Sequence, residues 1–210
     1  MPSSPGSGAG RFRTSPDVAV PHESTHPATP LSTVDATTAP STAGAFADLV
    51  ARACASSTVC DISEASTAVD GIPAHWVHDA DHAMVDAPIQ LWCEPPLVDS
   101  RDEVLFAENA VAFAVRLVGL AASDSEVLEA AVITTTQVVG YRPVHRARTE
   151  SGEMTIGSVS SPFGPLISIS HFGFHQIGGS DSICTQVTVT GRGEATAVPH
   201  HLTAIRPYST

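Results

Sequence analysis

The sequence predicts a mainly-β protein of the α+β class, a small β-barrel with one amphipathic helix at its N-terminal end and few other helices. Three observations lead to this fold class. Several short segments alternate apolar and polar residues, which is the two-residue period of a strand. Turn signals separate many of these segments, and only one segment carries a clear helical stripe. This combination is typical of barrels and sandwiches.

The clearest helix signal opens the folded part of the chain. Its apolar residues recur at the spacing of one helical face: Phe46, Leu49, Val50 and Ala53. A residue that favours the N-cap position precedes them, either Ser41 or Thr42. Two further segments have weaker helical patterns, residues 101–109 and 125–132.

Strand signals occupy most of the remaining chain. Alternation is clearest over residues 111–118 and 183–190, and a shorter alternating run covers residues 166–170. Gly191-Arg192-Gly193 predicts a turn, so residues 194–198 are expected to form the returning strand of a hairpin. Apolar residues around residues 79–82 mark at least two earlier strands: Trp76, Val85, Ile89, Leu91 and Trp92.

The chain divides into a tail and one domain. Residues 1–43 are rich in Pro, Ser, Thr and Ala, and such a segment buries too little apolar surface to offset the entropy of ordering it. We expect it to be disordered; a transit or pro-segment is the alternative. Residues 44–210 are long enough for a single domain with a full core.

The net charge of −12 excludes some classes of function. All basic residues are arginines. Because the chain is so acidic, it offers no positively charged surface for a phosphate backbone, and we expect no nucleic-acid partner. No apolar run approaches the roughly 20 residues of a membrane span, so we expect no membrane association. Without an apolar leader we expect a cytoplasmic protein. Its cysteines are then reduced, small and apolar: Cys54, Cys60, Cys93 and Cys184.

Three histidines lie close together in the chain, namely His75, His78 and His82. With Asp79 or Asp81 they form a candidate metal site, because imidazole nitrogens and carboxylate oxygens bind zinc and related ions. On a strand, His75 faces away from the other two, so convergence needs a turn between them. The alternative is an acidic hairpin tip with histidines on its surface.

A second pair, His171 and His175, surrounds Gly173. On a strand these three residues share one face, while Phe172 and Phe174 share the other. A glycine between two imidazoles allows a flat ligand to approach the backbone, and one imidazole suits haem iron or an aromatic cofactor. The alternative is a pair of surface histidines beside a closely packed strand.

Arg142, Arg146 and Arg148 form the one basic cluster of an acidic chain. On a regular strand all three share a face, and guanidinium groups bind phosphate or carboxylate through paired hydrogen bonds. Pro143 indicates an edge strand or the start of a strand. The alternative is that the arginines balance nearby acids, such as Glu150 and Glu153.

No catalytic residue can be assigned from a motif. The sequence contains no G-x-S-x-G nucleophile elbow, no Walker loop, no G-x-G-x-x-G after a strand and no H-E-x-x-H. Whether the protein is an enzyme therefore stays open.

Two segments resemble the flavin- and haem-binding split barrels of the pyridoxamine-phosphate-oxidase-like superfamily, in particular actinobacterial proteins related to haem utilisation. The first segment is Val115-Arg116-Leu117-Val118-Gly119-Leu120. The second runs from Ile183 to Val198 and is followed by Ala204-Ile205-Arg206-Pro207. The resemblance covers residues 44–207 and implies a split barrel that forms a homodimer, with its ligand at the subunit interface. No recognisable phosphate-binding pattern accompanies it, and no site residue is carried over from it.

Three hypotheses about function follow. The first is a split-barrel protein, related to oxidoreductases, that binds haem or FMN through His171, His175 and the arginine cluster. The second is an interaction or scaffold domain without a cofactor. The third and weakest is a metal-dependent enzyme that uses His75, His78 and His82.

Overall fold

The computed structural model describes residues 44–78, 88–95, 106–150 and 152–209. The tail predicted for residues 1–43 therefore lies outside the described residues. Within them, no helix combines the length and the apolar character needed to cross a membrane.

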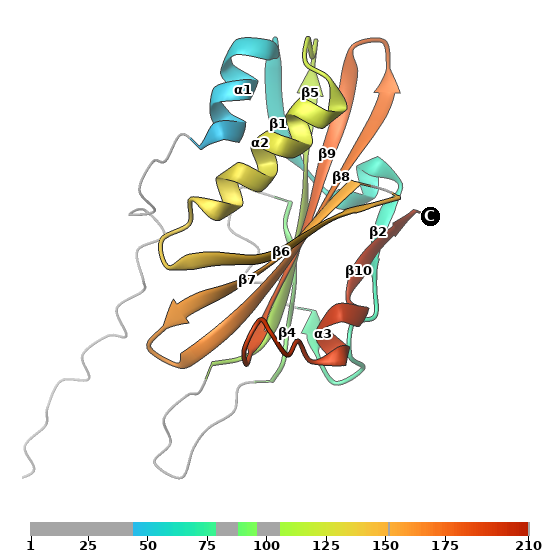
Figure 1. Cartoon of the computed structure of the whole chain (residues 1–210). Helices are drawn as coiled ribbons and strands as arrows, with labels where there is room; N and C mark the ends of the chain where they lie inside the picture. The colour runs from blue at the N-terminus through green and yellow to red at the C-terminus, as the bar shows by residue number, and fades with distance from the viewer. Residues whose placement is uncertain (1–43, 79–87, 96–105, 151, 210) are drawn as a thin grey trace, which may run out of the picture. The chain divides into compact units, whose positions relative to one another are not determined.

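The centre of the fold is an eight-stranded antiparallel sheet (Figure 1). Seven strands follow the spatial order β3-β4-β5-β9-β8-β7-β6. The eighth strand, β1, pairs with the same edge of β5 as β4 does: β4 pairs with the first half of β5 and β1 with the second half. In chain order the strands are β1 (Ser56–Cys60), β3 (Val77–His78), β4 (Gln90–Cys93), β5 (Asn109–Val118), β6 (Tyr141–Thr149), β7 (Gly152–Ser161), β8 (Gly164–Gly178) and β9 (Asp181–Arg192).

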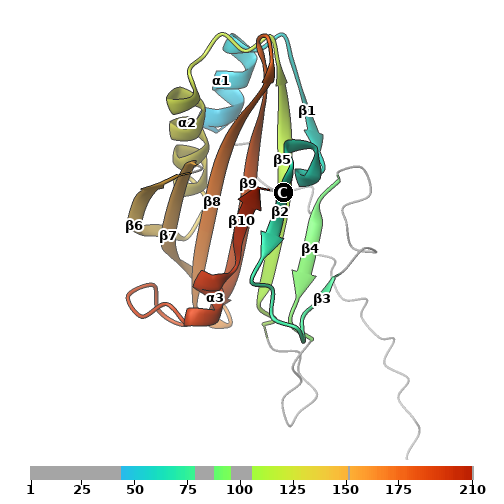
Figure 2. The same cartoon turned by 90° about the vertical axis from the view of Figure 1, so that its right-hand side faces the viewer.

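The mainly-β prediction is confirmed, but the sheet is not a closed barrel. In the part of the chain that the structure describes, β3 and β6 end the sheet and do not pair with each other. The apolar side chains on both faces of the sheet are buried by separate layers of other elements, so burial does not require the sheet to close into a barrel (Figure 2). The β6 edge carries arginines, a proline and a β-bulge, which are features that keep an open edge from pairing with another chain.

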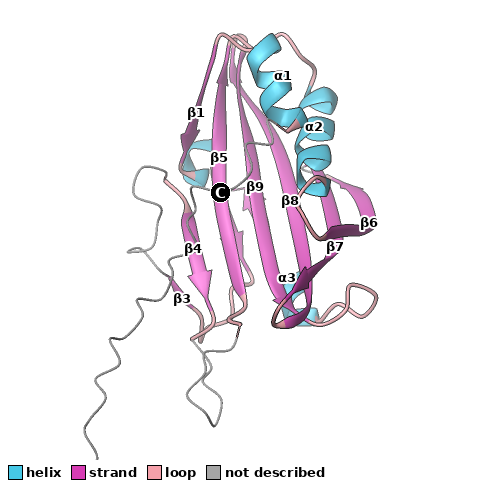
Figure 3. Ribbon diagram, turned by 90° about the vertical axis from the view of Figure 1, so that its left-hand side faces the viewer, coloured by secondary structure: helices cyan, strands magenta, loops and turns pink. Residues whose placement is uncertain are grey.

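Two helices, α1 (Ala45–Ala53) and α2 (Asp124–Thr136), cover one face of the sheet, which we call the helix face (Figure 3). Leu49 of α1 and Val127 of α2 pack there on Leu117 and Cys184. The amphipathic helix predicted at residues 46–53 is thus confirmed. The helix predicted at 125–132 is also confirmed, and it is one turn longer than expected.

The predicted N-cap of α1 is wrong, because Gly44 occupies that position. The hydroxyl of Thr134 on α2 accepts the backbone N–H of Phe46 at 2.9 Å and so replaces a local cap. A Cβ on residue 44 would lie 2.7 Å from Cγ2 of Thr134, so only glycine fits between the helices. By contrast, α2 has its own capping box, in which Ser123 and Glu126 bind each other's backbone N–H.

The opposite face, which we call the C-terminal face, is covered by shorter elements. These are the 3-10 helix η2 (Ile62–Ala65), the two-stranded sheet of β2 (Thr67–Asp70) and β10 (Arg206–Ser209), and α3 (His200–Ala204). Leu202 and Ile205 pack on Ile167, Ile169 and Val189 of the sheet.

Two sequence predictions fail on this side of the molecule. Residues 194–198 form no strand, because both edges of β9 are already paired with β5 and β8. In the segment predicted to be helical at 101–109, residues 106–108 have no regular structure and Asn109 begins β5, while residues 101–105 lie outside the described residues.

A buried carboxylate ties α3 to the end of the sheet. Glu108 accepts the backbone N–H of Arg192 at 2.9 Å, and its other oxygen lies 2.8 Å from Nε2 of His201. Arg192 in turn donates to Glu94 at 2.8 Å. Because Glu108 is almost fully buried, these contacts supply the partners that its carboxylate has lost from water.

Candidate functional site

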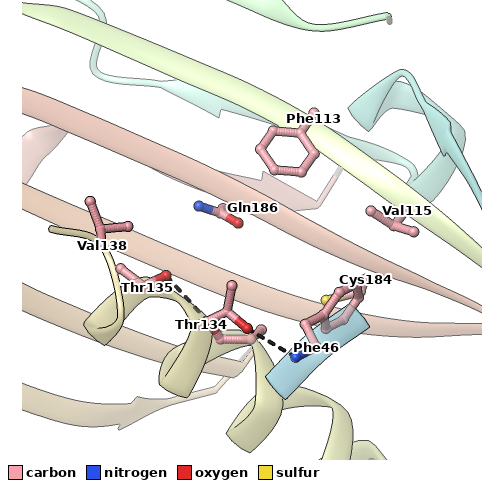
Figure 4. Close-up of a pocket in the computed structure, with 9 residues that line it drawn as sticks. Phe46, Phe113, Val115, Thr134, Thr135, Val138, Cys184 and Gln186 are labelled. Atoms are coloured by element: carbon pink, nitrogen blue, oxygen red, sulfur yellow. Dashed lines mark hydrogen bonds between the residues drawn. The ribbon is translucent and has the colours of Figure 1, made fainter. Parts of the chain in front are cut away.

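A pocket of about 270 Å³ lies between α2 and the helix face of the sheet (Figure 4). This volume is close to the lower end of the roughly 300–1,000 Å³ that is usual for small-molecule sites. Its apolar lining comes from three separate stretches of the chain, namely α1, β5, and α2 with the loop after it: Phe46, Phe113, Val115, Ala131 and Val138. Its other lining residues are Thr134, Thr135, Cys184 and Gln186.

The register of two neighbouring strands forms the floor of this pocket. Phe113 of β5 pairs with Gln186 of β9, and Val115 pairs with Cys184. All four side chains point to the helix face, because they occupy alternate positions of their strands. Figure 4 shows them opposite Thr135 and Val138, which come from α2 and the loop after it.

The only side-chain amide in the lining belongs to Gln186. Its Nε2 donates to Oγ1 of Thr188 at 2.9 Å, whereas Oε1 has no hydrogen-bond partner among the described residues. The hydroxyls of Thr134 and Thr135 donate to carbonyls of their own helix, those of Ala130 and Ala131. The oxygen of Gln186 is therefore a polar group that the pocket leaves open to a ligand.

None of the lining side chains is charged at neutral pH. Complete burial raises the pKa of the Cys184 thiol to about 12, so this cysteine stays protonated. A protonated thiol is a poor nucleophile and a poor metal ligand. Among the described residues, the lining thus offers apolar contacts and hydrogen-bonding groups but no ionised side chain.

Exposed apolar side chains follow α2 at the rim of the pocket. Val138 lines the pocket and is 55% exposed, and Val139 next to it is 83% exposed. Covering apolar side chains that are this exposed with a ligand or partner is energetically favourable, because it removes their surface from water.

The structure places His171, Gly173 and His175 on one face of β8, as predicted, and that face is the C-terminal face. They therefore lie on the opposite side of the sheet from the helix-face pocket. Burial, with a smaller effect from the charge of Arg206, lowers the pKa of His171 from 6.5 to about 4. Burial also lowers the pKa of His175. Both imidazoles are therefore neutral at pH 7.

A second pocket, of about 220 Å³, contains His175 and Gly173 but not His171. Gly173 pairs with Gly152 on one side and with Thr185 on the other, so two adjacent strands have no side chain at this point. Oγ1 of Thr67 lies 3.4 Å from Nε2 of His175 and donates its own proton to the carbonyl of Ala65. Nε2 of His175 is then the donor, and Nδ1 carries the free lone pair.

The prediction that three arginines share one face is wrong. A β-bulge at Val144 shifts the register, so Arg142 pairs with Ser158 whereas Arg146 pairs with Thr155, three residues away on β7. Arg142 therefore points to the opposite face from Arg146 and Arg148. Arg146 also forms ion pairs with Glu129 and Glu153, which is the alternative that the sequence offered. Anion binding by this cluster stays a prediction.

The predicted metal site lies only partly within the structure. His75 and His78 are exposed, and the ring of His78 lies 5.3 Å from that of Trp92. His82, Asp79 and Asp81 lie outside the described residues. In the described ranges, no group of three or more metal-ligating side chains is present.

Sequence reasoning missed the helix-face pocket, because its residues are far apart in the chain and none belongs to a motif. One signal was present: Gln186 is a long polar side chain at a position of β9 that follows the buried Cys184 on the same face. A polar side chain among the inward positions of a strand indicates a partner or a ligand.

Comparisons with known proteins do not identify the chain. No family model matches it, and no curated protein matches it. Among solved structures, it is similar to LpqN, a protein involved in cell envelope biogenesis of Mycobacterium tuberculosis. The TM-score is 0.49 and the identity 15%, over 64% of this chain and 78% of LpqN.

Proposed function

We propose that this domain binds a small, uncharged and mostly apolar molecule in the pocket between α2 and the sheet. The observation that carries the proposal is the lining: it combines five apolar side chains with one amide oxygen that has no hydrogen-bond partner among the described residues. Apolar walls with a few placed polar groups are the usual composition of small-molecule sites.

The same lining argues against a charged ligand. A carboxylate or phosphate would enter an apolar space with no cation among the lining residues, and burying an unpaired charge is costly. The proposal is thus a binding function, and it differs from the interaction domain without a cofactor that the sequence offered as an alternative, because that alternative expects no bound small molecule.

A fluorescence titration tests the proposal. N-phenyl-1-naphthylamine is uncharged, and its emission rises in apolar surroundings, so we expect a saturable increase with one site per chain. Thr135→Phe places a ring in the pocket, and overpacking of about 1–3 kcal/mol weakens binding about 5- to 100-fold.

Thr136→Phe is the matched control, because Thr136 is the next residue of α2 and does not line the pocket. It is expected to leave the affinity for the dye unchanged. If both variants bind the dye as the wild type does, the pocket is not the binding site and the proposal fails.

A second candidate function is binding of haem or FMN on the C-terminal face, at His171 and His175. Two observations support it. Gly173 lines the pocket without a side chain, which gives a flat ring access to the backbone, and Nδ1 of His175 supplies a lone pair when Nε2 donates to Thr67. The pocket there fits one ring system better than a whole porphyrin, because its volume is about 220 Å³.

Absorbance spectra of the protein after addition of haemin or FMN test this second candidate. It predicts a shifted Soret band or a perturbed flavin band in the wild type, and loss of either in His175→Ala. Spectra identical to those of the free cofactors would refute it.

Three predictions from the sequence also remain proposals: a homodimer, a cytoplasmic location and the metal site around His75, His78 and His82. Native mass spectrometry of the full chain tests the first and third together. A mass of one chain without metal would contradict both.

A further inference from the structure

We infer that Thr188 and Ser170 orient the side-chain amide of Gln186 with its oxygen toward the pocket, so that the pocket selects uncharged ligands that carry a hydrogen-bond donor. This inference rests on the proposed function and adds the class of ligand. In it, Gln186 contacts the ligand, whereas Thr188 and Ser170 are positioning residues.

The inference starts from a row of polar side chains on the helix face. Nε2 of Gln186 lies 2.9 Å from Oγ1 of Thr188, and this oxygen lies 3.0 Å from Oγ of Ser170. The three residues come from two neighbouring strands, with Thr188 of β9 paired directly with Ser170 of β8. Ser170 is almost fully buried, so its end of the row is shielded from water.

Each of the two contacts in this row uses a donor that belongs to the row itself. Thr188 accepts the N–H of Gln186, so its single hydroxyl proton is free to go to Ser170. One of the two N–H groups of the amide is thereby used inside the protein, and the amide oxygen is left facing the pocket. This orientation also has the lower cost in an empty pocket, because an orphaned N–H is rarer and less tolerated than an orphaned carbonyl.

An acceptor on the wall selects for a donor on the ligand. A hydroxyl or N–H group satisfies Oε1 of Gln186, whereas an ether of the same size leaves it unpaired and removes it from water. A carboxylate brings no donor at neutral pH, and it meets no cation in the lining. The pocket is therefore expected to rank an alcohol above its isomeric ether, and both above a fatty acid anion.

Competition against N-phenyl-1-naphthylamine tests this ranking with two isomers, 1-octanol and heptyl methyl ether. They have the same atoms and differ in the donor. In the wild type, 1-octanol is expected to displace the dye at about 3- to 10-fold lower concentration, which corresponds to one net hydrogen bond.

Two variants separate positioning from packing. Thr188→Val keeps the shape of the side chain but removes the acceptor for Gln186, so the ratio between the isomers is expected to fall to about one while dye binding persists. Thr190→Val is the matched control, since it is the next residue on the same face of β9 and no contact joins it to Gln186. It is expected to keep the wild-type ratio.

The outcomes distinguish the inference from the proposed function. Equal displacement by the two isomers in the wild type would overturn the inference, even though dye binding would still support the function. An unchanged ratio in Thr188→Val would overturn the role of Thr188. No dye binding at all would overturn the proposed function itself.

Discussion

The hydroxyl of Thr134 on α2 accepts the backbone N–H of Phe46 on α1 at 2.9 Å, across 88 positions of sequence. Both residues line the helix-face pocket. The bond serves as the missing N-cap of α1 and holds the two helices in the positions that form the pocket wall. Thr134 thus contributes both to the stability of the helical layer and to the shape of the pocket.

Removal of the Thr134 hydroxyl is expected to lower the stability of the helical layer and to alter the shape of the pocket. Thr134→Val keeps the volume of the side chain but leaves the N–H of Phe46 without its partner, so we expect a loss of about 1 kcal/mol in the free energy of unfolding. Thr134→Ser retains the hydroxyl and serves as the control. Urea unfolding measures the difference, and equal stability of the two variants would contradict the capping role.

The carboxylate of Glu108 is expected to be among the most sensitive polar groups of the fold. Glu108→Ala leaves the backbone N–H of Arg192 and the ring of His201 without their partner, at a cost of about 3 kcal/mol. Glu108→Gln keeps a carbonyl acceptor of the same shape and is expected to lose less. The midpoints of urea denaturation report the difference; a value for Glu108→Ala within experimental error of the wild type would refute it.

The histidines on the C-terminal face predict a loss of stability in mild acid. His171 titrates near pH 6.5 in the unfolded chain and near pH 4 in the folded one, so between these values the unfolded chain binds the proton. The stabilisation is therefore complete above pH 6.5 and is lost as the pH falls through 4. Its size is about 3 kcal/mol at most. His175 acts in the same direction.

Unfolding of the wild type and of His171→Gln between pH 7 and pH 4 measures this dependence. The variant lacks the buried imidazole, so its stability is expected to fall less steeply over this range. Parallel curves for the two proteins would show that His171 does not contribute.

At Tyr141, unlike at Thr134 and Glu108, removal of a polar group is not expected to lower the stability of the fold. Its hydroxyl is buried beside that of Thr155, and among the described residues neither oxygen has a hydrogen-bond partner of good geometry. Tyr141→Phe removes a polar group that has lost its water, so stability is expected to stay the same or to rise by about 1 kcal/mol. A decrease of that size in thermal unfolding experiments would mean that the hydroxyl has a partner.

Periodicity predicted the elements whose burial alternates. The stripe from Phe46 to Ala53 predicted α1, which packs one side on the core, and alternation predicted β5 and β9, where buried and half-buried residues alternate over residues 109–114 and 186–192. The strand that begins at Gly164 was harder to delimit. Its residues from Leu166 to Ser170 are buried on both sides, so burial there does not follow the two-residue period.

The failures of the sequence analysis also have physical causes. Barrel closure depends on which strand edges remain free, and alternation within a strand does not report this. A single bulge at Val144 separated Arg142 from Arg146, because one extra residue reverses the facing of all that follow. The pocket depends on contacts between residues as distant as Phe46 and Gln186, which no local pattern encodes.

The most direct test of the central claim is the position of a bound ligand. Intermolecular nuclear Overhauser effects can be measured between N-phenyl-1-naphthylamine and the methyl groups of the protein. Binding in the helix-face pocket predicts contacts to the methyls of Val115, Ala131 and Val138, which line that pocket. Contacts only to methyls of the opposite face, such as those of Ile169 and Val187, would contradict it.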